Sequence, residues 1–179
     1  NKYNKFIIYL FFLSILIVGI NVIKDYGVSS DEFERRSIGF NNLNYIGKII
    51  SPKLTEKIAG DKDYQNFDEY VLNYYGGAII DAPLALIEIA LGIKDKKNQF
   101  LLKHYFNFII FFLSLISFYK IINFRIKNWK IALIGTFFLF LSPRIFANSF
   151  YNNVDIIFMS FVIFSIHSGL NYLKDRSFL

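Results

Sequence analysis

The chain of 179 residues is 54% hydrophobic and 20% aromatic, with 22 phenylalanines, and it carries a formal net charge of +6. Soluble domains are about 45–50% apolar, so this composition indicates a membrane protein. The absence of cysteine excludes disulfides and thiolate metal sites. The net positive charge does not indicate nucleic-acid binding. Residues 24–103 carry 11 Lys/Arg against 12 Asp/Glu, so the excess of basic residues lies in short segments outside this range.

Four apolar blocks of the chain are long enough to cross a bilayer as helices. A spanning helix needs about 20 mostly apolar residues, and each block reaches that length with its uncharged polar flanks. The first block exceeds the core of a signal peptide and lacks a small-residue cleavage site, so we expect it to be retained. The predicted fold is an all-α polytopic membrane protein whose transmembrane helices cover about residues 6–23, 102–122, 130–148 and 155–173.

The basic residues predict the orientation of these spans. Short basic loops stay on the cytoplasmic side, whereas long loops are translocated largely regardless of charge. The outer loop 24–101 and the turn 142–154 are therefore predicted to face outward. Three short flanks carry the cytoplasmic charge: Lys2 and Lys5; Lys120, Arg125, Lys127 and Lys130; and Lys174 and Arg176.

The outer loop is long enough to carry function and short helices of its own. Ser29 and Glu32 have the spacing of a capping box, and acidic residues in a first turn suit the helix dipole. This pattern predicts a short helix from about residue 30. Helical turns and loop are expected over the polar middle of the loop, Ser51 to Glu69.

The stretch 76–93 is 18 residues long and mostly apolar, yet it holds Asp81, Pro83 and Glu88. A charged group at the centre of a spanning helix costs about 2.5–3.5 kcal/mol on insertion scales, and a span here would also break the charge asymmetry. Asp81 and Glu88 are seven residues apart and share one face of a helix. We therefore expect an interfacial helix on the outer leaflet, and not a fifth span.

Three groups of ionisable residues lie at the outer surface in this topology, and such groups at a membrane are functional candidates. Each also has an ordinary interpretation. The first two acids could cap the helix that starts near residue 30, the arginine could extend to lipid headgroups, and the last acid could cap the fourth span. The groups are Asp31-Glu32, Ser142-Pro143-Arg144 and Asn152-Asn153-Val154-Asp155. The turn of about ten residues between the last two groups is expected to bring Arg144 and Asp155 together.

The two histidines do not indicate a zinc site. Lys103 and His104 begin the second span at the same surface, where contact with lipid headgroups is the ordinary interpretation. His167 lies inside the fourth span and is expected to be a packing residue with a hydrogen bond. The chain has no HExxH pattern, so zinc has no support, and a requirement for another divalent metal is left open.

Four motifs follow one another along the chain: Ser-Ser-Asp-Glu-Phe from Ser29, Tyr-Tyr-Gly-Gly from Tyr74, Lys-His-Tyr-Phe-Asn from Lys103, and the stretch Leu141 to Asp155 with its Pro-Arg, Tyr-Asn and Asp. In this order they resemble the dolichyl-phosphate-mannose–protein mannosyltransferase family, which uses polyprenyl-phosphate sugars. The last motif is the most specific, and Lys103 stands where arginine is expected. The resemblance covers most of the chain and corresponds to the N-terminal part of a family member.

The resemblance implies a role for each matching residue. It implies that Asp31 is the base in the active site of the first outer loop, supported by Glu32, because a carboxylate can accept the proton of the acceptor hydroxyl. An arginine suits the departing phosphate, since its planar fork binds two oxygens. A carboxylate could also face the positive charge that develops at the anomeric carbon, and single displacement would invert that carbon. The substrate-binding residues implied are Arg144, Asp155, Lys103 and His104.

We therefore expect residues 1–179 to be the N-terminal part of one transmembrane glycosyltransferase domain. It would transfer a sugar from a polyprenyl-phosphate donor to an acceptor hydroxyl, in a bacterial inner membrane with the active site facing the periplasm. The expected partners are the lipid-linked donor and membrane lipids, and not nucleic acid; the sugar and the acceptor stay open. The alternative is a transporter or channel fragment without chemistry, although transporters more often bury ionisable groups in mid-span. A membrane scaffold with a degenerate site is a third interpretation.

Overall fold

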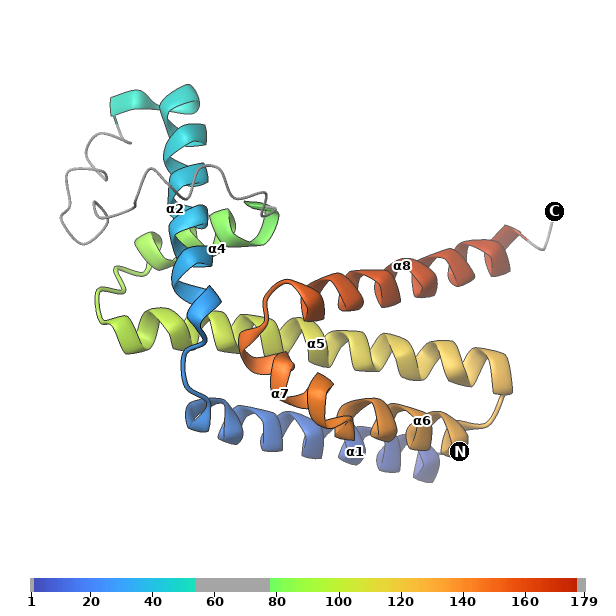
Figure 1. The fold of residues 1–179 in the computed structure, drawn as a ribbon. Helices are drawn as coiled ribbons and strands as arrows, with labels where there is room; N and C mark the ends of the chain where they lie inside the picture. The colour runs from blue at the N-terminus through green and yellow to red at the C-terminus, as the bar shows by residue number, and fades with distance from the viewer. Residues whose placement is uncertain (1, 54–77, 177–179) are drawn as a thin grey trace. The chain divides into compact units, whose positions relative to one another are not determined.

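The computed structural model describes residues 2–53 and 78–176, and the regular elements in them are all helices (Figure 1). The expected all-α class is confirmed for this part of the chain. The Tyr74–Gly77 motif and most of the polar middle of the loop lie outside the described residues. In chain order the helices are α1 (Lys2–Val22), η1 (Ile23–Asp25), α2 (Ser30–Ile50), α4 (Ala78–Ala90), α5 (Lys96–Ile126), α6 (Trp129–Leu141), α7 (Pro143–Tyr151) and α8 (Asp155–Arg176).

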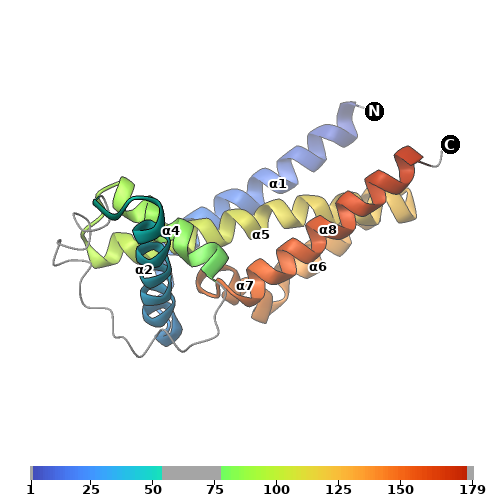
Figure 2. The ribbon, with the colours of Figure 1, turned by 90° about the horizontal axis from the view of Figure 1, so that it is seen from above.

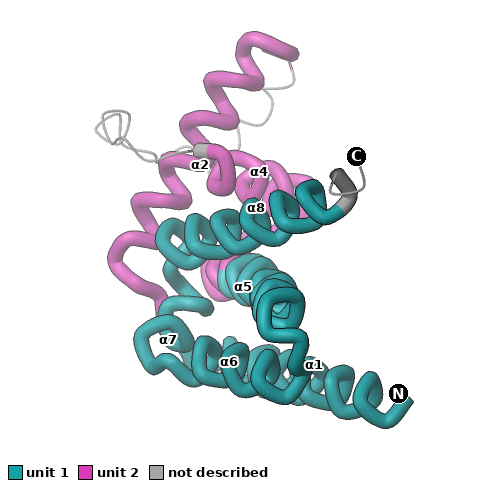
Figure 3. Tube along the Cα trace, turned by 90° about the vertical axis from the view of Figure 1, so that its right-hand side faces the viewer, with its two compact units in different colours: residues 1–27, 104–179 teal, residues 28–103 magenta. Residues whose placement is uncertain are grey.

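The chain divides into two compact units (Figure 3). Unit 1 comprises residues 1–27 and 104–179, and unit 2 comprises residues 28–103. Unit 1 contains the long helices α1 and α8, most of α5, and the pair α6–α7. Unit 2 contains α2, α4 and the first eight residues of α5, from Lys96 to Lys103.

Three helical segments are long and apolar enough to cross a membrane: Lys2–Asp25, Lys96–Ile126 and Asp155–Lys174. They contain the first, second and fourth expected spans. The predicted membrane class rests on their length and composition. Their outward surfaces carry large apolar side chains, among them Leu13 on α1 and Phe158 on α8, which are exposed in the protein and would be covered by lipid.

The third expected span, 130–148, is not one continuous helix. The chain breaks at Ser142, and α6 and α7 are bent by 66° relative to each other. The break has a local cause, because a residue that precedes proline is disfavoured in the helical region, and Ser142 has φ −58° and ψ 115°. Pro143 then starts α7 at a position that proline favours. Because α6 alone is about 20 Å long, against about 30 Å for the hydrocarbon core, the bent pair makes a fourth span only when it is taken together.

Aromatic side chains form much of the core of unit 1. Phe108 and Phe150 are fully buried and stack with their ring centroids 5.5 Å apart. Phe12 of α1 contacts Tyr119 of α5 edge to face at 5.7 Å. Gly19 of α1 leaves room for the Phe108 ring of α5, because a Cβ atom added there would lie 1.8 Å from that ring. The contact of the Phe108 ring with α1 therefore depends on the absence of a side chain at Gly19.

Helix α4 occupies most of the stretch 76–93 for which the sequence predicts an interfacial helix. With 13 residues it is about 20 Å long, and it is not among the described helices that could cross a membrane. It ends in a left-handed Gly92 with φ +61°, where the Gly92 and Ile93 amides donate to the Ile89 and Glu88 carbonyls. This Schellman arrangement stops the helix and turns the chain toward α5. The interfacial position of the helix stays a prediction.

The Gly92→Ala variant is expected to lower the free energy of unfolding by about 1–2 kcal/mol, because an L-residue is strained in the left-handed region. Thermal unfolding of the purified protein in detergent measures the effect. Gly27→Ala is the matched control, since an added Cβ there meets nothing within 4 Å and Gly27 does not have a positive φ. Equal stability of the two variants would contradict the role given to the Gly92 turn.

Candidate functional site

Helix α2 begins at Ser30 after the N-cap residue Ser29, which confirms the predicted helix start. The helix is not short as predicted, because it runs for 21 residues to Ile50. The Ser29 side chain makes no capping hydrogen bond, although its carbonyl oxygen accepts from the Glu32 amide at 3.2 Å. Asp31 lies inside the first turn and accepts a hydrogen bond from the Ser30 hydroxyl at 3.2 Å. Asp31 therefore does not occupy the N-cap position, where a capping aspartate would stand.

The two neighbouring acids have different surroundings. Asp31 is exposed, whereas Glu32 is only 3% exposed. Successive residues on a helix point about 100° apart, so one carboxylate can face outward while the next faces the interior. Of this pair, Asp31 is the carboxylate that a bound molecule could reach.

Five charged side chains come together in unit 2, and we refer to them as the charge cluster: Glu32, Arg36, Asp81, Glu88 and Lys103. Arg36 forms a bidentate ion pair with Glu88, with Nε donating to Oε2 at 3.1 Å and Nη2 donating to Oε1. The pair is largely buried, since the side chains are 14% and 3% exposed. The Arg36 guanidinium also lies 4.7 Å from the centroid of the Phe40 ring. A two-point contact of this kind fixes the orientation of α4 against α2.

Lys103 joins the start of α5 to the first turn of α2. Its Nζ atom donates to the Glu32 carbonyl oxygen at 3.3 Å, and the residue is 4% exposed. The carboxylates of Asp81, Glu32 and Glu88 attract this ammonium group, and Arg36 repels it. Sequence reasoning placed Lys103 among the substrate-binding residues. In unit 2 it lies in the interior and supports the turn that carries Asp31.

Helices α2 and α4 pack against each other, and α4 crosses behind α2 in Figure 1 and lies next to it in Figure 2. Gly39 marks their close approach, because a Cβ atom added there would lie 2.4 Å from the Asp81 carbonyl oxygen. Asp81 and Glu88 share one face of α4, as their spacing predicts, and that face is the buried one. The contact therefore holds the acids of α4 next to Arg36.

In unit 1, Arg144 and Asp155 are both exposed, and no ion pair joins them in the described part of the chain. Sequence reasoning expected a turn over residues 142–154 to bring them together. The segment instead forms helix α7, with Arg144 in its first turn and Asp155 beyond its end. At about 1.5 Å per residue, Tyr151 at the end of α7 lies roughly 10 Å from Arg144 along the helix axis.

Asn152 supplies the cap at the start of α8 that the sequence interpretation gave to Asp155. The Asn152 Oδ1 atom accepts from the Val154 and Asp155 amides at 3.1 and 2.9 Å. Its Nδ2 atom donates to the Asp155 carboxylate at 3.0 Å. The carboxylate of Asp155 is thus held by a side chain and stays exposed.

The end of α7 is anchored in the core of unit 1. Phe150 stacks on Tyr26 with ring centroids 4.4 Å apart, and the Asn107 side chain donates to the Phe150 carbonyl oxygen at 3.4 Å. Burial raises the pKa of the Tyr26 hydroxyl, and Tyr151 raises it further, so this phenol stays protonated at neutral pH. His104, which the resemblance assigns to substrate binding, is buried, with 1% of its surface exposed. The contacts of Phe150 hold the C-terminal end of α7 in place, and Arg144 lies in the first turn of the same helix.

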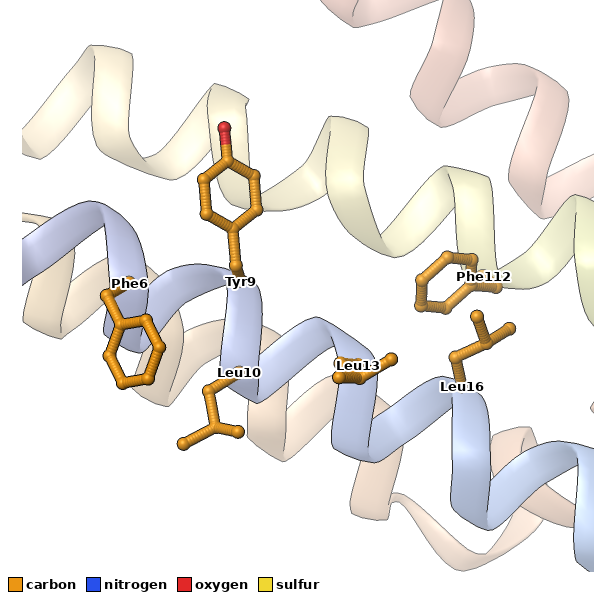
Figure 4. Close-up of a pocket in the computed structure, with 6 residues that line it drawn as sticks. All are labelled: Phe6, Tyr9, Leu10, Leu13, Leu16 and Phe112. Atoms are coloured by element: carbon orange, nitrogen blue, oxygen red, sulfur yellow. The ribbon is translucent and has the colours of Figure 1, made fainter.

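Within the described residues, no three His, Asp or Glu side chains lie close enough together to hold a metal ion. The His167 ring nitrogen Nε2 lies 3.3 Å from the Asn171 side-chain amide, which agrees with a hydrogen-bonded packing residue. A groove of about 400 Å³ runs along α1 and is lined by apolar and aromatic side chains (Figure 4). The lining residues are Phe6, Tyr9, Leu10, Leu13, Leu16 and Phe112.

Comparison of the chain with protein-family models, with curated proteins and with solved structures gives no match. The described residues therefore define only a class of protein. It is an all-helical protein with three helices that are long and apolar enough to cross a membrane, or four when the bent pair α6–α7 is counted as one.

Sequence reasoning missed Arg36 as a member of the candidate site. Asp81 and Glu88 served there as evidence against a fifth span, and not as partners of a cation. The available signal was their seven-residue spacing, because two acids on one face of a mostly apolar helix need a positive partner if that face is buried. The partner itself is 52 residues away in the chain, so no local pattern identifies it.

Proposed function

We propose that this chain belongs to a membrane glycosyltransferase that moves a sugar from a polyprenyl-phosphate donor to an acceptor hydroxyl at the outer face of the membrane. The observation that carries the proposal is the position of Asp31. It is an exposed carboxylate on the first turn of α2, one residue before the buried charge cluster. The order of the motifs along the chain supports the same reaction class.

The surroundings of Asp31 suit a general base. A base must be held within reach of the proton it accepts, and side chains on rigid helices are positioned more accurately than those on loops. Lys103 binds the main chain of Glu32, and the Arg36–Glu88 pair joins the same helix to α4. In this proposal Asp31 accepts the proton of the acceptor hydroxyl, and Glu32 and Lys103 position its turn. The hydroxyl oxygen bonds to the anomeric carbon as the bond to the lipid phosphate breaks.

Arg144 is the proposed ligand of the departing phosphate. It is exposed in the first turn of α7, where backbone amides are not used by the helix itself, and the N-cap residue Ser142 makes no side-chain capping bond. Free amides and a positive helix end favour an anion, and the planar fork of arginine adds two donors. This combination suits a phosphate group.

One observation favours the alternative of a transporter. Broken helices are common at transporter binding sites, and α6–α7 is bent by 66°. The break lies beside the exposed Arg144, and no ionisable residue lies within α6 after its first turn. A transporter would move its substrate without forming a covalent product, so the two functions can be separated by assay.

The proposal is tested by incubating membranes that contain the full-length protein with radiolabelled polyprenyl-phosphate sugars. We expect labelled sugar to become covalently attached to an endogenous acceptor, with release of polyprenyl phosphate. Membranes without the protein serve as the control. Uptake of label into vesicles without any covalent product would support the transporter and refute the transferase.

The Arg144→Lys variant is expected to raise the KM for the lipid-linked donor about tenfold or more. Lysine keeps the charge but loses the fork, and one charge-assisted hydrogen bond contributes about 1.5–3 kcal/mol. Arg125→Lys is the matched control, because Arg125 is also exposed but lies at the end of α5. An unchanged KM for Arg144→Lys would indicate that Arg144 contacts lipid headgroups and does not bind the donor phosphate.

A further inference from the structure

Helix α4 has two faces of opposite character. Its buried face carries Asp81, Leu84 and Glu88, packed in unit 2. Its outward face carries Ile79 and Leu86, which are 83% and 52% exposed, and the adjoining positions are also apolar. The outward positions recur with helical spacing and form one stripe: Ile79, Pro83, Leu86, Ile87 and Ala90, continued by Leu91.

This arrangement reverses the usual pattern of a helix at a protein surface. A helix next to water normally buries its apolar stripe and exposes its charges. In α4 the two acids are paired inside the unit, and the stripe faces out. Apolar surface in water is unfavourable, whereas the same surface against acyl chains is not. The distribution of residues therefore fits an apolar medium outside α4.

The chain connects unit 2 to membrane-crossing segments at both ends. It enters the unit after the candidate span Lys2–Asp25 and leaves it through the first turns of α5, which is itself a candidate span. The chain thus ties unit 2 to two candidate spans, and only five residues separate α4 from the second of them.

Three exposed lysines follow α4 within this short connection and the start of α5: Lys94, Lys96 and Lys97. Asp95 stands among them, and its side chain accepts a hydrogen bond from the Asn98 amide. Lysine side chains at such a position extend their ammonium groups to lipid phosphates while their methylene stems cover apolar surface. The apolar stripe and the lysines thus match the two layers of a lipid surface, acyl chains and phosphates.

We propose that the outward stripe of α4 is inserted into the interfacial layer of a phospholipid bilayer, with Lys94, Lys96 and Lys97 at the level of the lipid phosphates. The stripe is the membrane-contacting surface of unit 2, and the buried acids are held away from lipid by Arg36. This inference does not depend on the proposed transferase activity. It assigns the membrane-contacting face and the phosphate-level lysines of the interfacial helix that the sequence predicts over 76–93.

The absence of cysteine allows a direct test with single labelled positions. Leu86→Cys and, separately, Ile79→Cys in the full-length protein are labelled with an environment-sensitive fluorophore and reconstituted in phosphatidylcholine–phosphatidylglycerol vesicles. Lipids brominated on their acyl chains are expected to quench most of the fluorescence at both positions. Aqueous iodide is expected to have little effect. Because both side chains are exposed, the substitutions leave the packing of α4 intact.

Glu34→Cys is the matched control on an exposed position of α2. Iodide should quench its label, and brominated lipid should not. Quenching of the α4 labels by iodide would show that the stripe faces water and would overturn the proposal. Protection of the α4 labels from both quenchers would show that protein covers the stripe, from a second copy or another segment, and would overturn it equally.

Discussion

Replacing Asp31 with asparagine in the full-length protein is expected to lower sugar turnover by about 10²–10⁴-fold, the usual contribution of a general base. Asparagine has the same size but cannot accept a proton at neutral pH. Folding and binding of the lipid-linked donor are expected to persist, because Asp31 is exposed and its only described contact is with the neighbouring Ser30. The measurement is the initial rate of labelled-sugar transfer at saturating donor.

Two comparisons make this result specific. Glu34→Gln is the matched control, because it changes another exposed acid of α2 in the same conservative way and should leave the rate unchanged. If Asp31 acted only through its charge at the helix N-terminus, asparagine would cost about 0.3–1 kcal/mol of stability and leave the transfer rate nearly unchanged. Near-normal transfer by Asp31→Asn would therefore leave the catalytic assignment without support.

Removing one partner of the Arg36–Glu88 pair is expected to lower the free energy of unfolding by about 3–5 kcal/mol, because the remaining charge is left buried without its hydrogen-bonded partner. Arg36→Met and Glu88→Leu test the two partners separately. The effect should be larger than that of Gly92→Ala, which strains the backbone without leaving a buried charge. Equilibrium unfolding in mixed micelles measures the loss, with proteolysis of unit 2 as an independent reading.

The double variant Arg36→Met with Glu88→Leu completes the cycle. Replacing a buried pair by apolar residues of similar volume is often neutral or stabilising, so the double variant should recover most of the lost stability. Additive losses from the two substitutions would indicate that the residues do not act as a pair. A stability change confined to Glu88→Leu would assign the effect to the interior of α4 alone.

Local features of the sequence predict much of this fold. Long apolar blocks predict the helices that contain the first, second and fourth spans, because length and composition suffice for that inference. Ser29 and the acids after it predict the start of α2 at residue 30. The break at Ser142 had a local signal as well, in the proline that follows it. The span expected over 130–148 is accordingly the bent pair α6–α7, which makes a fourth span when its two helices are counted together.

Local sequence patterns predict the helical class, the apolar segments and the shared face of Asp81 and Glu88, and the order of the motifs suggests a transferase. The folded chain shows that this shared face is buried against α2, that Glu32 is interior while Asp31 is exposed, and that Lys103 binds a main-chain carbonyl. The physical reason is the range of the interactions. Helix propensity and hydropathy act over a few residues, whereas the contacts of Arg36 and Lys103 join residues 52 and 71 positions apart, and only packing brings those together.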